Sequence, residues 1–397
     1  MMKFNNNIEA LNWITNRKRV SKGIVSFCEV MKKIGDYQNK IKVIHVAGTN
    51  GKGSTVKFIE SILMKGKYKV GTFTSPHMTH HFDRISINTK WIGEDDFFRI
   101  FYQHLDLILE YELGMFEIDT LIMYQYFYEN NVDFAIVEVG IGGRHDSTNC
   151  LLTSIISVIV SVGKDHIELL GESISEIAKE KSGIIKDGID CVVGDVSDEV
   201  MDVLLEEAKL KNAKIIKCDE LDNNIELKSK ALYQRHNAKV AVCVIKKLIQ
   251  KNLISISEKQ IKDGLKECFW LGRYEVVSDK PKVILDGAHN IDGIMALKES
   301  LKLERKPLTI IFASLKSKDA DNMISELEAI SDQLIICEFD YHRARKISDY
   351  NKSENILYYK NFQDAYSEAL NSVEDGCICI CGSLYFISYV KDKLKSR

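Results

Sequence analysis

A lysine surrounded by three glycines stands between a β-branched run and a helix-length segment, in the stretch VIHVAGTNGKGSTVKFIESIL of residues 43–63. A strand that ends in a glycine-rich turn leaves the free N–H groups of the next helix exposed, and these groups and the helix dipole attract an anion. Glycines let the backbone curl around a phosphate, and a lysine in the loop can reach the outer phosphates. The residues predicted to bind a phosphate group in this loop are Gly48, Thr49, Asn50, Gly51, Lys52, Gly53 and Ser54.

The loop departs from the common P-loop spacing, because its glycines stand three apart and Gly53 separates Lys52 from Ser54. Ser54 and Thr55 are expected to open the helix. A plain glycine-rich turn between a strand and a helix is the simpler interpretation. It does not explain a lysine inside the turn, so phosphate binding is favoured.

Acidic and imidazole side chains follow two other apolar runs. Glu138 ends the run in DFAIVEVGIGGRHDSTN, and Asp165 and His166 follow the run in SIISVIVSVGKDH. The carboxyl ends of parallel strands meet at one sheet edge, where such sheets bind ligands. Hard oxygen ligands suit Mg²⁺, so Glu138 is the first predicted metal ligand.

The segment ESISEIAKEKSGIIK predicts a helix with clear ends. Ser173 and Glu176 form a capping box, and Gly183 is placed to end the helix. Lys181 falls on the apolar stripe at helical spacing. From the pattern alone, a lysine at this position extends its amine along the apolar surface to water.

The elements that must position these residues alternate along the chain of 397 residues. Apolar runs such as KVIHVAG, KVGTFTS, DCVVGD, KVILDGA, LTIIFAS, QLIICEF and CICICGS are separated by amphipathic segments of helix length. This pattern is typical of parallel sheets covered by helices on both faces. The predicted class is α/β, with a P-loop-type parallel-sheet ATPase domain over residues 1–275 and a smaller Rossmann-like domain over 276–397. A polar stretch at 272–282 is the expected hinge.

Composition excludes several classes. Hydrophobic residues make up 45%, charged residues 28%, and the net charge is −3. A general nucleic-acid binder would usually be basic. The sequence shows no apolar run of about 18 residues and no signal-peptide pattern. We expect no nucleic-acid or membrane partner. We expect a cytoplasmic location. The ten scattered cysteines are expected to be thiols, with Cys377, Cys379 and Cys381 buried on one face of a strand.

From HVAGTNGKGST onward, the chain resembles the Mur-ligase superfamily, and more narrowly the folylpolyglutamate synthase/dihydrofolate synthase family. The order and number of motifs carry the resemblance over nearly the whole chain. After the loop these are TSPHMTHHFDRISIN, FEIDT, EVGIGGRHDSTN, VGKDHIELLGESISEIAKEKSGIIK, YQRHNAKVAV, WLGR, LDGAHN and CGSLYFI.

The resemblance implies roles for individual residues. The metal ligands are Ser75, Glu138, His166 and Lys181, with Lys181 carbamylated and two Mg²⁺ bound. The remaining nucleotide contacts are Asn237 to the adenine, Arg273 to the phosphates, Asp286 to the ribose and His289 near the γ-phosphate. The folate-binding residues are Glu117, Thr120, Gly142, Gly143 and Arg144.

Simpler roles stay open for some of these residues. Ser75 could be only a turn residue before Pro76. Asn237 could be a helix N-cap. Glu117 and Thr120 could simply start a helix. The resemblance assigns no residue to glutamate, because SLKSKDADN departs from the family's commoner D-K-D.

The resemblance implies an ATP-dependent amide ligase, expected as a monomer, that adds L-glutamate to a folate or dihydropteroate carboxylate through an acyl phosphate. The expected catalytic residues are Lys52, His289 and Lys181. Closure of the two domains is expected to assemble the site. Two alternatives remain: another Mur-type ligase acting on a cell-wall precursor or similar carboxylate, and a nucleotide-binding regulator without enzymatic activity.

Overall fold

The computed structural model describes residues 3–17 and 23–395 and divides the chain into two compact units. Unit 1 comprises Met1–Ile225 and Asn237–Lys266, and unit 2 comprises Glu226–His236 and Glu267–Arg397. The domain boundary that the sequence predicts between residues 275 and 276 stays a prediction. Each unit is described by itself below.

Unit 1 is built on a sheet with the strand order β4-β3-β2-β5-β1-β6-β7-β8. Strands β2, β5, β1, β6, β7 and β8 run parallel, whereas β3 and β4 are antiparallel additions at one edge. The central strands are buried along their whole length, as expected for runs of Val and Ile covered on both faces. The strands are β1 (Val43–Ala47), β2 (Val70–Phe73), β3 (Ile85–Ile87), β4 (Lys90–Trp91), β5 (Phe134–Glu138), β6 (Ile156–Ile159), β7 (Cys191–Val193) and β8 (Ile215–Lys217).

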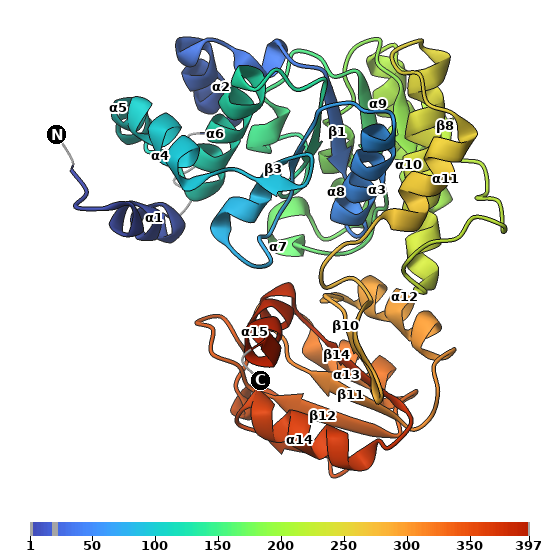
Figure 1. Ribbon diagram of the computed structural model, residues 1–397. Helices are drawn as coiled ribbons and strands as arrows, with labels where there is room; N and C mark the ends of the chain where they lie inside the picture. Colours follow the sequence, from blue (N-terminus) through green and yellow to red (C-terminus); the bar gives the residue numbers. More distant parts are fainter. Residues whose placement is uncertain (1–2, 18–22, 396–397) are drawn as a thin grey trace. The chain divides into compact units, whose positions relative to one another are not determined.

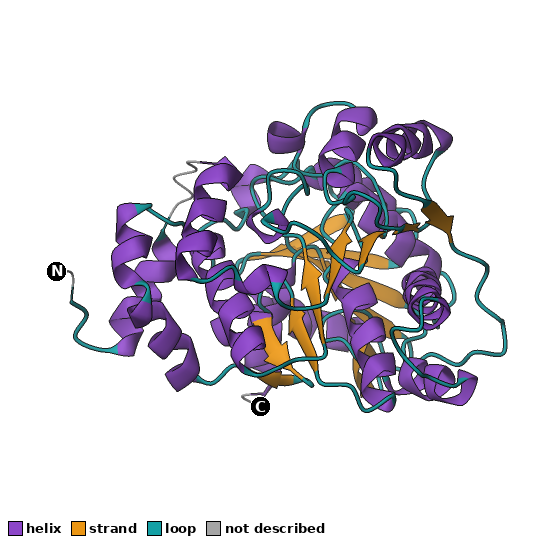
Figure 2. Cartoon of the chain, turned by 90° about the horizontal axis from the view of Figure 1, so that it is seen from above, coloured by secondary structure: helices purple, strands orange, loops and turns teal. Residues whose placement is uncertain are grey.

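Helices cover this sheet, and Figure 2 shows them in purple around the orange strands. Helix α3 packs against β1, β2 and β5, while α1, α4 and α6 belong to one apolar cluster with the N-terminal segment. The helices are α1 (Asn7–Asn16), α2 (Gly23–Ile34), α3 (Lys52–Lys65), α4 (Glu94–Gln103), α5 (Leu105–Glu110), α6 (Met115–Glu129), α7 (Ile167–Leu170), α8 (Ile174–Ser182), α9 (Asp198–Leu210), α10 (Leu232–Gln250) and α11 (Glu258–Glu267).

Unit 2 is built on a second sheet, with the order β13-β12-β11-β14-β10-β9. Only β9 runs antiparallel to its neighbour. Helix α14 packs against β11, β12 and β13, and α15 against β14 (Figure 1). The elements are β9 (Glu275–Asp279), β10 (Lys282–Leu285), α12 (Ile291–Leu301), β11 (Leu308–Phe312), α13 (Ala320–Glu328), β12 (Gln333–Cys337), β13 (Ile356–Tyr359), α14 (Phe362–Ser372), β14 (Cys377–Cys381) and α15 (Leu384–Lys395).

The predicted α/β class with two mainly parallel sheets is confirmed. Each of the apolar runs singled out in the sequence forms a strand. The short strands β3, β4, β8, β9 and β13 were not predicted, because they are short or partly exposed and carry no long apolar run.

The prediction that all cysteines are thiols is wrong for one pair. Cys28 in α2 and Cys150 form a disulfide with a Cα–Cα distance of 5.5 Å. They lie 122 residues apart, so their spacing gave no signal. The other cysteines form no disulfide in the part of the chain that the structure describes, and the three in β14 are buried as predicted. Across the described residues, no helix has the length and apolar character needed to cross a membrane.

Candidate active site

The glycine-rich loop follows β1, which lies between β5 and β6 in the middle of the unit 1 sheet. Helix α3 begins at Lys52, two residues before the start that the sequence predicted at Ser54. Gly51 precedes it with a φ of +82°, and a Cβ there would lie 2.1 Å from Oδ1 of Asn237. Only glycine fits this position, because a side chain would meet both a left-handed backbone and a neighbouring amide.

The connection after β6 supports the other side of the loop. Thr49 N donates to Ser161 O at 2.9 Å, and Thr49 Oγ1 donates to Gly163 O at 3.0 Å. Asn50 N donates to Ser161 Oγ at 3.0 Å. These bonds between two adjacent strand ends fix the path of the backbone in front of α3. Thr49 therefore positions the loop, in addition to its predicted contact with a nucleotide.

The Lys52 side chain bends back over its own loop. Its Nζ donates to Gly48 O at 2.9 Å and to Thr49 O at 3.3 Å. The ammonium charge is thus held at the N-terminus of α3, where the helix dipole also favours an anion. A triphosphate bound here would meet both sources of positive potential.

Glu138 ends β5, directly beside β1, and only 3% of its surface is exposed. Ser75, which follows the neighbouring strand β2, points its backbone N–H toward Glu138 Oε2 at 3.4 Å. The two predicted metal ligands therefore lie side by side at the carboxyl ends of two paired strands. A nearly buried carboxylate at a sheet edge is a suitable ligand for a divalent cation.

Lys181 lies on the buried face of α8 and is 3% exposed. Burial lowers the pKa of its ammonium from 10.5 to about 7; the charge of Lys52 lowers it further, while Asp165 and Glu180 oppose the shift. The predicted helix bounds and the capping box between Ser173 and Glu176 are confirmed. The structure therefore brings Lys181 into the electrostatic neighbourhood of the glycine-rich loop, with an amine that is partly neutral near pH 7.

His166 follows β6 at the same sheet edge. It adopts a left-handed φ of 52°, its side chain is 37% exposed, and Nδ1 lies 3.8 Å from Glu168 Oε1. In the described part of the chain, no group of three or more His, Cys, Asp and Glu side chains is arranged to hold a metal ion. The predicted ligand set contains only two residues of these types, Glu138 and His166.

The turn from Gly142 to Arg144 packs against the end of α8. Arg144 N donates to Glu180 O at 2.8 Å, and a Cβ on Gly143 would lie 2.8 Å from the same oxygen. The Arg144 guanidinium forms an ion pair with Glu207 at 2.8 Å. Burial of the turn against α8 explains the two glycines, and the Arg144 side chain already has an acidic partner.

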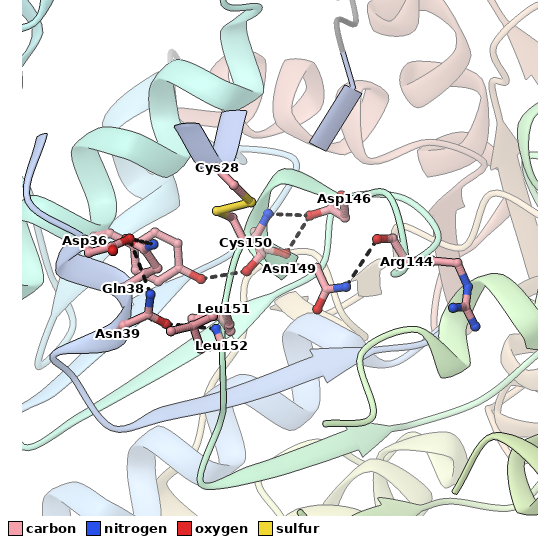
Figure 3. Close-up of a disulfide and its surroundings, with 12 residues drawn as sticks. Cys28, Asp36, Gln38, Asn39, Arg144, Asp146, Asn149, Cys150, Leu151 and Leu152 are labelled. Atoms are coloured by element: carbon pink, nitrogen blue, oxygen red, sulfur yellow. Dashed lines mark hydrogen bonds between the residues drawn. A yellow bond between two sulfur atoms is a disulfide. The ribbon is translucent and has the colours of Figure 1, made fainter. Parts of the chain in front are cut away.

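The segment after this turn is held by contacts that the sequence did not reveal (Figure 3). Asn149 Nδ2 donates to Arg144 O at 3.2 Å and to Gly183 O at 3.0 Å, next to the Cys28–Cys150 disulfide. The buried Asp146 accepts from Thr148 N, as a residue that caps the short turn. An Asp two positions before a Thr is the only sequence signal for this turn.

A buried histidine in β1 supports the same segment. His45 Nε2 lies 2.9 Å from Thr148 Oγ1, which donates to Asp146 Oδ1. Burial lowers the pKa of His45 to about 3, so the ring is neutral and Nε2 donates to the hydroxyl. The glycine-rich loop and the Asp146 turn are therefore connected through β1.

Two predicted folate residues lie in α6. Glu117 Oε2 accepts from Gly114 N at 2.8 Å, as the acidic member of a helix cap. Thr120 Oγ1 donates to Phe116 O at 2.7 Å and lies 3.1 Å from Ser147 Oγ. The cap favours the helix-start interpretation for Glu117, whereas Thr120 touches the segment that carries Asp146.

In α10, Asn237 lies in the second turn, because the helix begins at Leu232. The N-cap interpretation of Asn237 is therefore wrong. Its side chain is buried against Gly51 of the glycine-rich loop, so it lies where a nucleotide on the loop would be bound.

Three predicted nucleotide residues lie in unit 2, after or beside β10. Asp286 is buried and accepts from the hydroxyl of Tyr233, from Tyr274 N at 2.8 Å and from Ala288 N at 2.9 Å. A Cβ on Gly287 would lie 3.3 Å from Arg273 Nη1. His289 Nδ1 lies 2.8 Å from Gly287 O, which fixes that nitrogen as the donor. Asp286 thus organises the turn after β10.

Comparison with known proteins agrees with this arrangement. Residues 46–261 match the family described as the Mur ligase middle domain, and residues 272–384 match the Mur ligase glutamate ligase domain. The dihydrofolate synthase/folylpolyglutamate synthase of Bacillus subtilis is 35% identical over 98% of this chain and 99% of its own length.

Two solved structures are also similar. The apo form of folylpolyglutamate synthase from L. casei has a TM-score of 0.86 at 29% identity, covering 98% of this chain and 100% of its own. E. coli FolC in complex with DHPP and ADP has a TM-score of 0.89 at 24% identity, with 98% of each chain covered. The second likeness shows the fold alone.

Proposed function

Because the chain belongs to the dihydrofolate synthase/folylpolyglutamate synthase family of the Mur ligases, we propose that it joins L-glutamate to the carboxylate of a folate or of dihydropteroate. The enzyme is an ATP-dependent, ADP-forming ligase. One observation carries the proposal: Lys52 and Glu138 lie at the ends of two paired strands, and Lys181 lies near enough to Lys52 to feel its charge, in a chain that matches this family over almost its whole length.

We assign ATP to the glycine-rich loop of unit 1. Glycine occupies the tight positions of the loop, where it packs against Asn237 and Ser161, and Lys52 holds its charge over the loop. Asn237 packs against Gly51 and is the proposed adenine contact. The proposed contacts from this unit are Gly48, Thr49, Asn50, Gly51, Lys52, Gly53, Ser54 and Asn237.

The chemistry begins with a carboxylate, which is a poor electrophile. A carboxylate oxygen of the pteroate or folate attacks the γ-phosphorus of ATP, ADP leaves, and an acyl phosphate forms. The amine of glutamate then attacks the acyl carbon, and the tetrahedral intermediate collapses to an amide and inorganic phosphate. Phosphoryl transfer mainly requires alignment and neutralisation of charge, which Lys52 supplies in unit 1.

The residues present fit Mg²⁺ at two proposed sites. Glu138 offers a nearly buried carboxylate beside Ser75, and His166 follows the strand on the other side of β1. Mg²⁺, when bound, neutralises charge on the phosphates of ATP. Glu138 and Ser75 are the proposed ligands of one ion, and His166 contributes to the other.

Lys181 is suited to carbamylation. Its amine is buried, and its pKa of about 7 leaves a neutral fraction at physiological pH. A neutral amine adds to CO₂ and releases a proton, which converts a cation into a carboxylate-like oxygen ligand. We propose this carbamate as a further ligand for Mg²⁺, tested by electron density at Lys181 in crystals grown with bicarbonate.

The remaining assignments rest on the family resemblance. Arg273, Asp286 and His289 are proposed to contact the nucleotide, although the Asp286 carboxylate already accepts three hydrogen bonds in unit 2. The proposed folate residues are Glu117, Thr120, Gly142, Gly143 and Arg144. The cytoplasmic location and the monomeric state stay predictions.

The decisive experiment offers purified protein ATP, Mg²⁺ and L-glutamate together with either dihydropteroate or a reduced folate. The expected result is ADP release that requires both glutamate and one of the two acceptors. Release with both acceptors would assign both activities. No release with either acceptor, but release with a cell-wall precursor carboxylate, would move the chain to another branch of the Mur ligases.

A further inference from the structure

An arginine in unit 2 lies beside a stacked pair of tyrosines at the carboxyl end of the sheet. Arg343 lies in the connection that follows β12. Its guanidinium carbon is 5.3 Å from the centre of the Tyr341 ring and 5.2 Å from that of Tyr385. Arg343 Nε donates to Tyr341 Oη at 3.1 Å, and Nη2 donates to Tyr341 Oη and, at 3.2 Å, to Tyr385 Oη.

The two rings form a rigid support. Tyr341 and Tyr385 stack with centroids 4.5 Å apart and planes 16° from parallel. Behind Tyr341 lies the buried ring of Phe339, which packs in turn against Phe386. Tyr385 belongs to the first turn of α15, which follows β14 in Figure 1. The guanidinium is therefore placed by two segments of the sheet edge, the connection after β12 and the start of α15 after β14.

Backbone bonds fix the arginine further. Lys316 N donates to Arg343 O at 3.0 Å, and Arg345 N donates to Ser314 O at 2.9 Å, around an isolated bridge between Leu315 and Ala344. The connections after β11 and β12 thus run together. An exposed arginine usually loses conformational entropy when it binds a ligand, and this one is ordered in advance.

The charge of Arg343 has no acidic counterpart in the part of the chain that the structure describes. Three carboxylates lie nearby in the sequence. Glu338 lies 3.1 Å from Lys346 and Asp349 lies 4.0 Å from Lys316, while the exposed Asp340 forms no ion pair with Arg343. Within the described residues, Arg343 Nη1 donates no hydrogen bond. The tyrosine hydroxyls accept from Arg343, and the Tyr341 hydroxyl also bonds to that of Tyr385, so one hydroxyl proton stays available to a ligand.

We infer that Arg343, Tyr341 and Tyr385 bind a carboxylate of a glutamyl group. The Nη1 donors and one hydroxyl proton match the oxygens of a carboxylate, and hydrogen bonds from a guanidinium to a carboxylate are stronger than those between neutral groups. The position agrees with the general location of ligands at the carboxyl ends of parallel strands. The inference rests on the proposed function, which supplies two sources of this group: free glutamate, and the glutamyl tail of a folate acceptor.

Steady-state kinetics with dihydropteroate as acceptor isolates the first source, because dihydropteroate carries no glutamyl group. The variants are Arg343→Ala, Arg343→Lys and Tyr385→Phe. The matched control is Arg305→Ala, which removes an exposed arginine that precedes β11, at the opposite end of that strand. We expect the KM for glutamate to rise about tenfold or more in Arg343→Ala, with kcat changed less than about threefold.

A second arm uses a reduced folate that carries a glutamyl tail. A rise confined to the KM for this folate would assign the pocket to the tail and support the inference. Unchanged KM values for both glutamate and the folate, relative to Arg305→Ala, would overturn it. Arg343→Lys keeps the positive charge but loses the planar guanidinium that binds a carboxylate through two hydrogen bonds, so its KM should rise less than that of Arg343→Ala. This variant provides the measurement should Arg343→Ala fail to fold.

Equilibrium binding separates this inference from the proposed reaction. Calorimetry with a γ-linked glutamate dipeptide is expected to show weaker binding to Arg343→Ala than to Arg305→Ala. Wild-type protein that releases no ADP with any folate would refute the proposed function. Equal affinities of the two variants for the dipeptide would refute the Arg343 site.

Discussion

The two sheets of this protein place charge at their carboxyl ends in opposite ways. In unit 1, Lys181 and Glu138 are each 3% exposed, and burial brings the pKa of Lys181 to about 7. In unit 2, Arg343 is exposed and stays charged at every accessible pH, supported by two stacked tyrosines. A buried amine can change its protonation and be modified, whereas a stacked guanidinium offers constant charge for recognition.

The difference arises in the residues that follow each strand. Strands β1 and β5 are followed by glycines, and those after β5 let α8, which carries the buried Lys181, approach closely. Strand β12 is followed by a segment with aromatic and basic residues, whose backbone pairs with the connection after β11 while the Arg343 side chain stays exposed. Chemistry is therefore expected in unit 1, and recognition of carboxylates in unit 2.

The largest effect is expected from Lys52→Ala. Removal of the loop cation should lower kcat/KM by about a thousandfold or more, as removal of a phosphate-neutralising cation does in other phosphoryl transfer enzymes. Lys65→Ala, at the other end of α3, is the matched control. ADP release assays provide the measurement. Activity of Lys52→Ala within tenfold of the control would remove unit 1 from the chemistry.

Lys181→Met should separate activity from stability. We expect kcat to fall at least a hundredfold, because the variant has no amine to carbamylate and no charge near the loop. The same variant should unfold at a higher urea concentration than the wild type at pH 6.5, since it removes a buried ammonium. A variant that is both inactive and less stable would show that Lys181 mainly supports packing.

The pH dependence of stability sharpens the same point. The pKa of Lys181 is about 7 in the folded protein and near its ordinary value of 10.5 when unfolded. Between these values the unfolded chain binds a proton that the folded chain does not, so the free energy of unfolding should rise with pH, by up to about 1.4 kcal/mol per unit. Urea unfolding in CO₂-free buffer from pH 6.5 to 9.5 should show this rise in the wild type, relative to Lys181→Met.

A smaller effect is expected from Gly51→Ala. The new methyl group would meet Asn237 Oδ1 and a left-handed backbone, so stability should fall by about 1–3 kcal/mol and nucleotide affinity should fall as well. Gly93→Ala, where a Cβ meets nothing within 4 Å, is the control. Thermal unfolding with and without ADP gives both quantities. An unchanged stabilisation by ADP in Gly51→Ala would argue against a nucleotide on this loop.

The smallest effect is expected from Glu117→Gln. The helix cap to Gly114 weakens, which should cost about 0.5–1 kcal/mol of stability. The KM for folate should stay within about twofold of the wild type if capping is the main role. A larger rise in the KM for folate would support a contact between Glu117 and folate and would argue against helix capping as its main role.

Local patterns predicted much of this architecture. The strand, glycine-rich loop and helix of residues 43–65 and the capped helix that carries Lys181 were readable because short-range signals set them. The contacts of His45 with Thr148, and of Arg343 with Tyr385, join residues far apart in the chain. No local pattern encodes such a pairing, and the Cys28–Cys150 disulfide was missed for the same reason.

Isotope transfer tests the central claim most directly, namely that the edge of unit 1 phosphorylates the acceptor carboxylate. Dihydropteroate or folate labelled with ¹⁸O in its carboxylate is turned over with ATP and glutamate, and the inorganic phosphate is analysed by mass spectrometry. The account predicts one ¹⁸O atom in each phosphate released, and about a thousandfold slower release of labelled phosphate from Lys52→Ala. Unlabelled phosphate from an active enzyme would contradict an acyl phosphate and the role assigned to the loop.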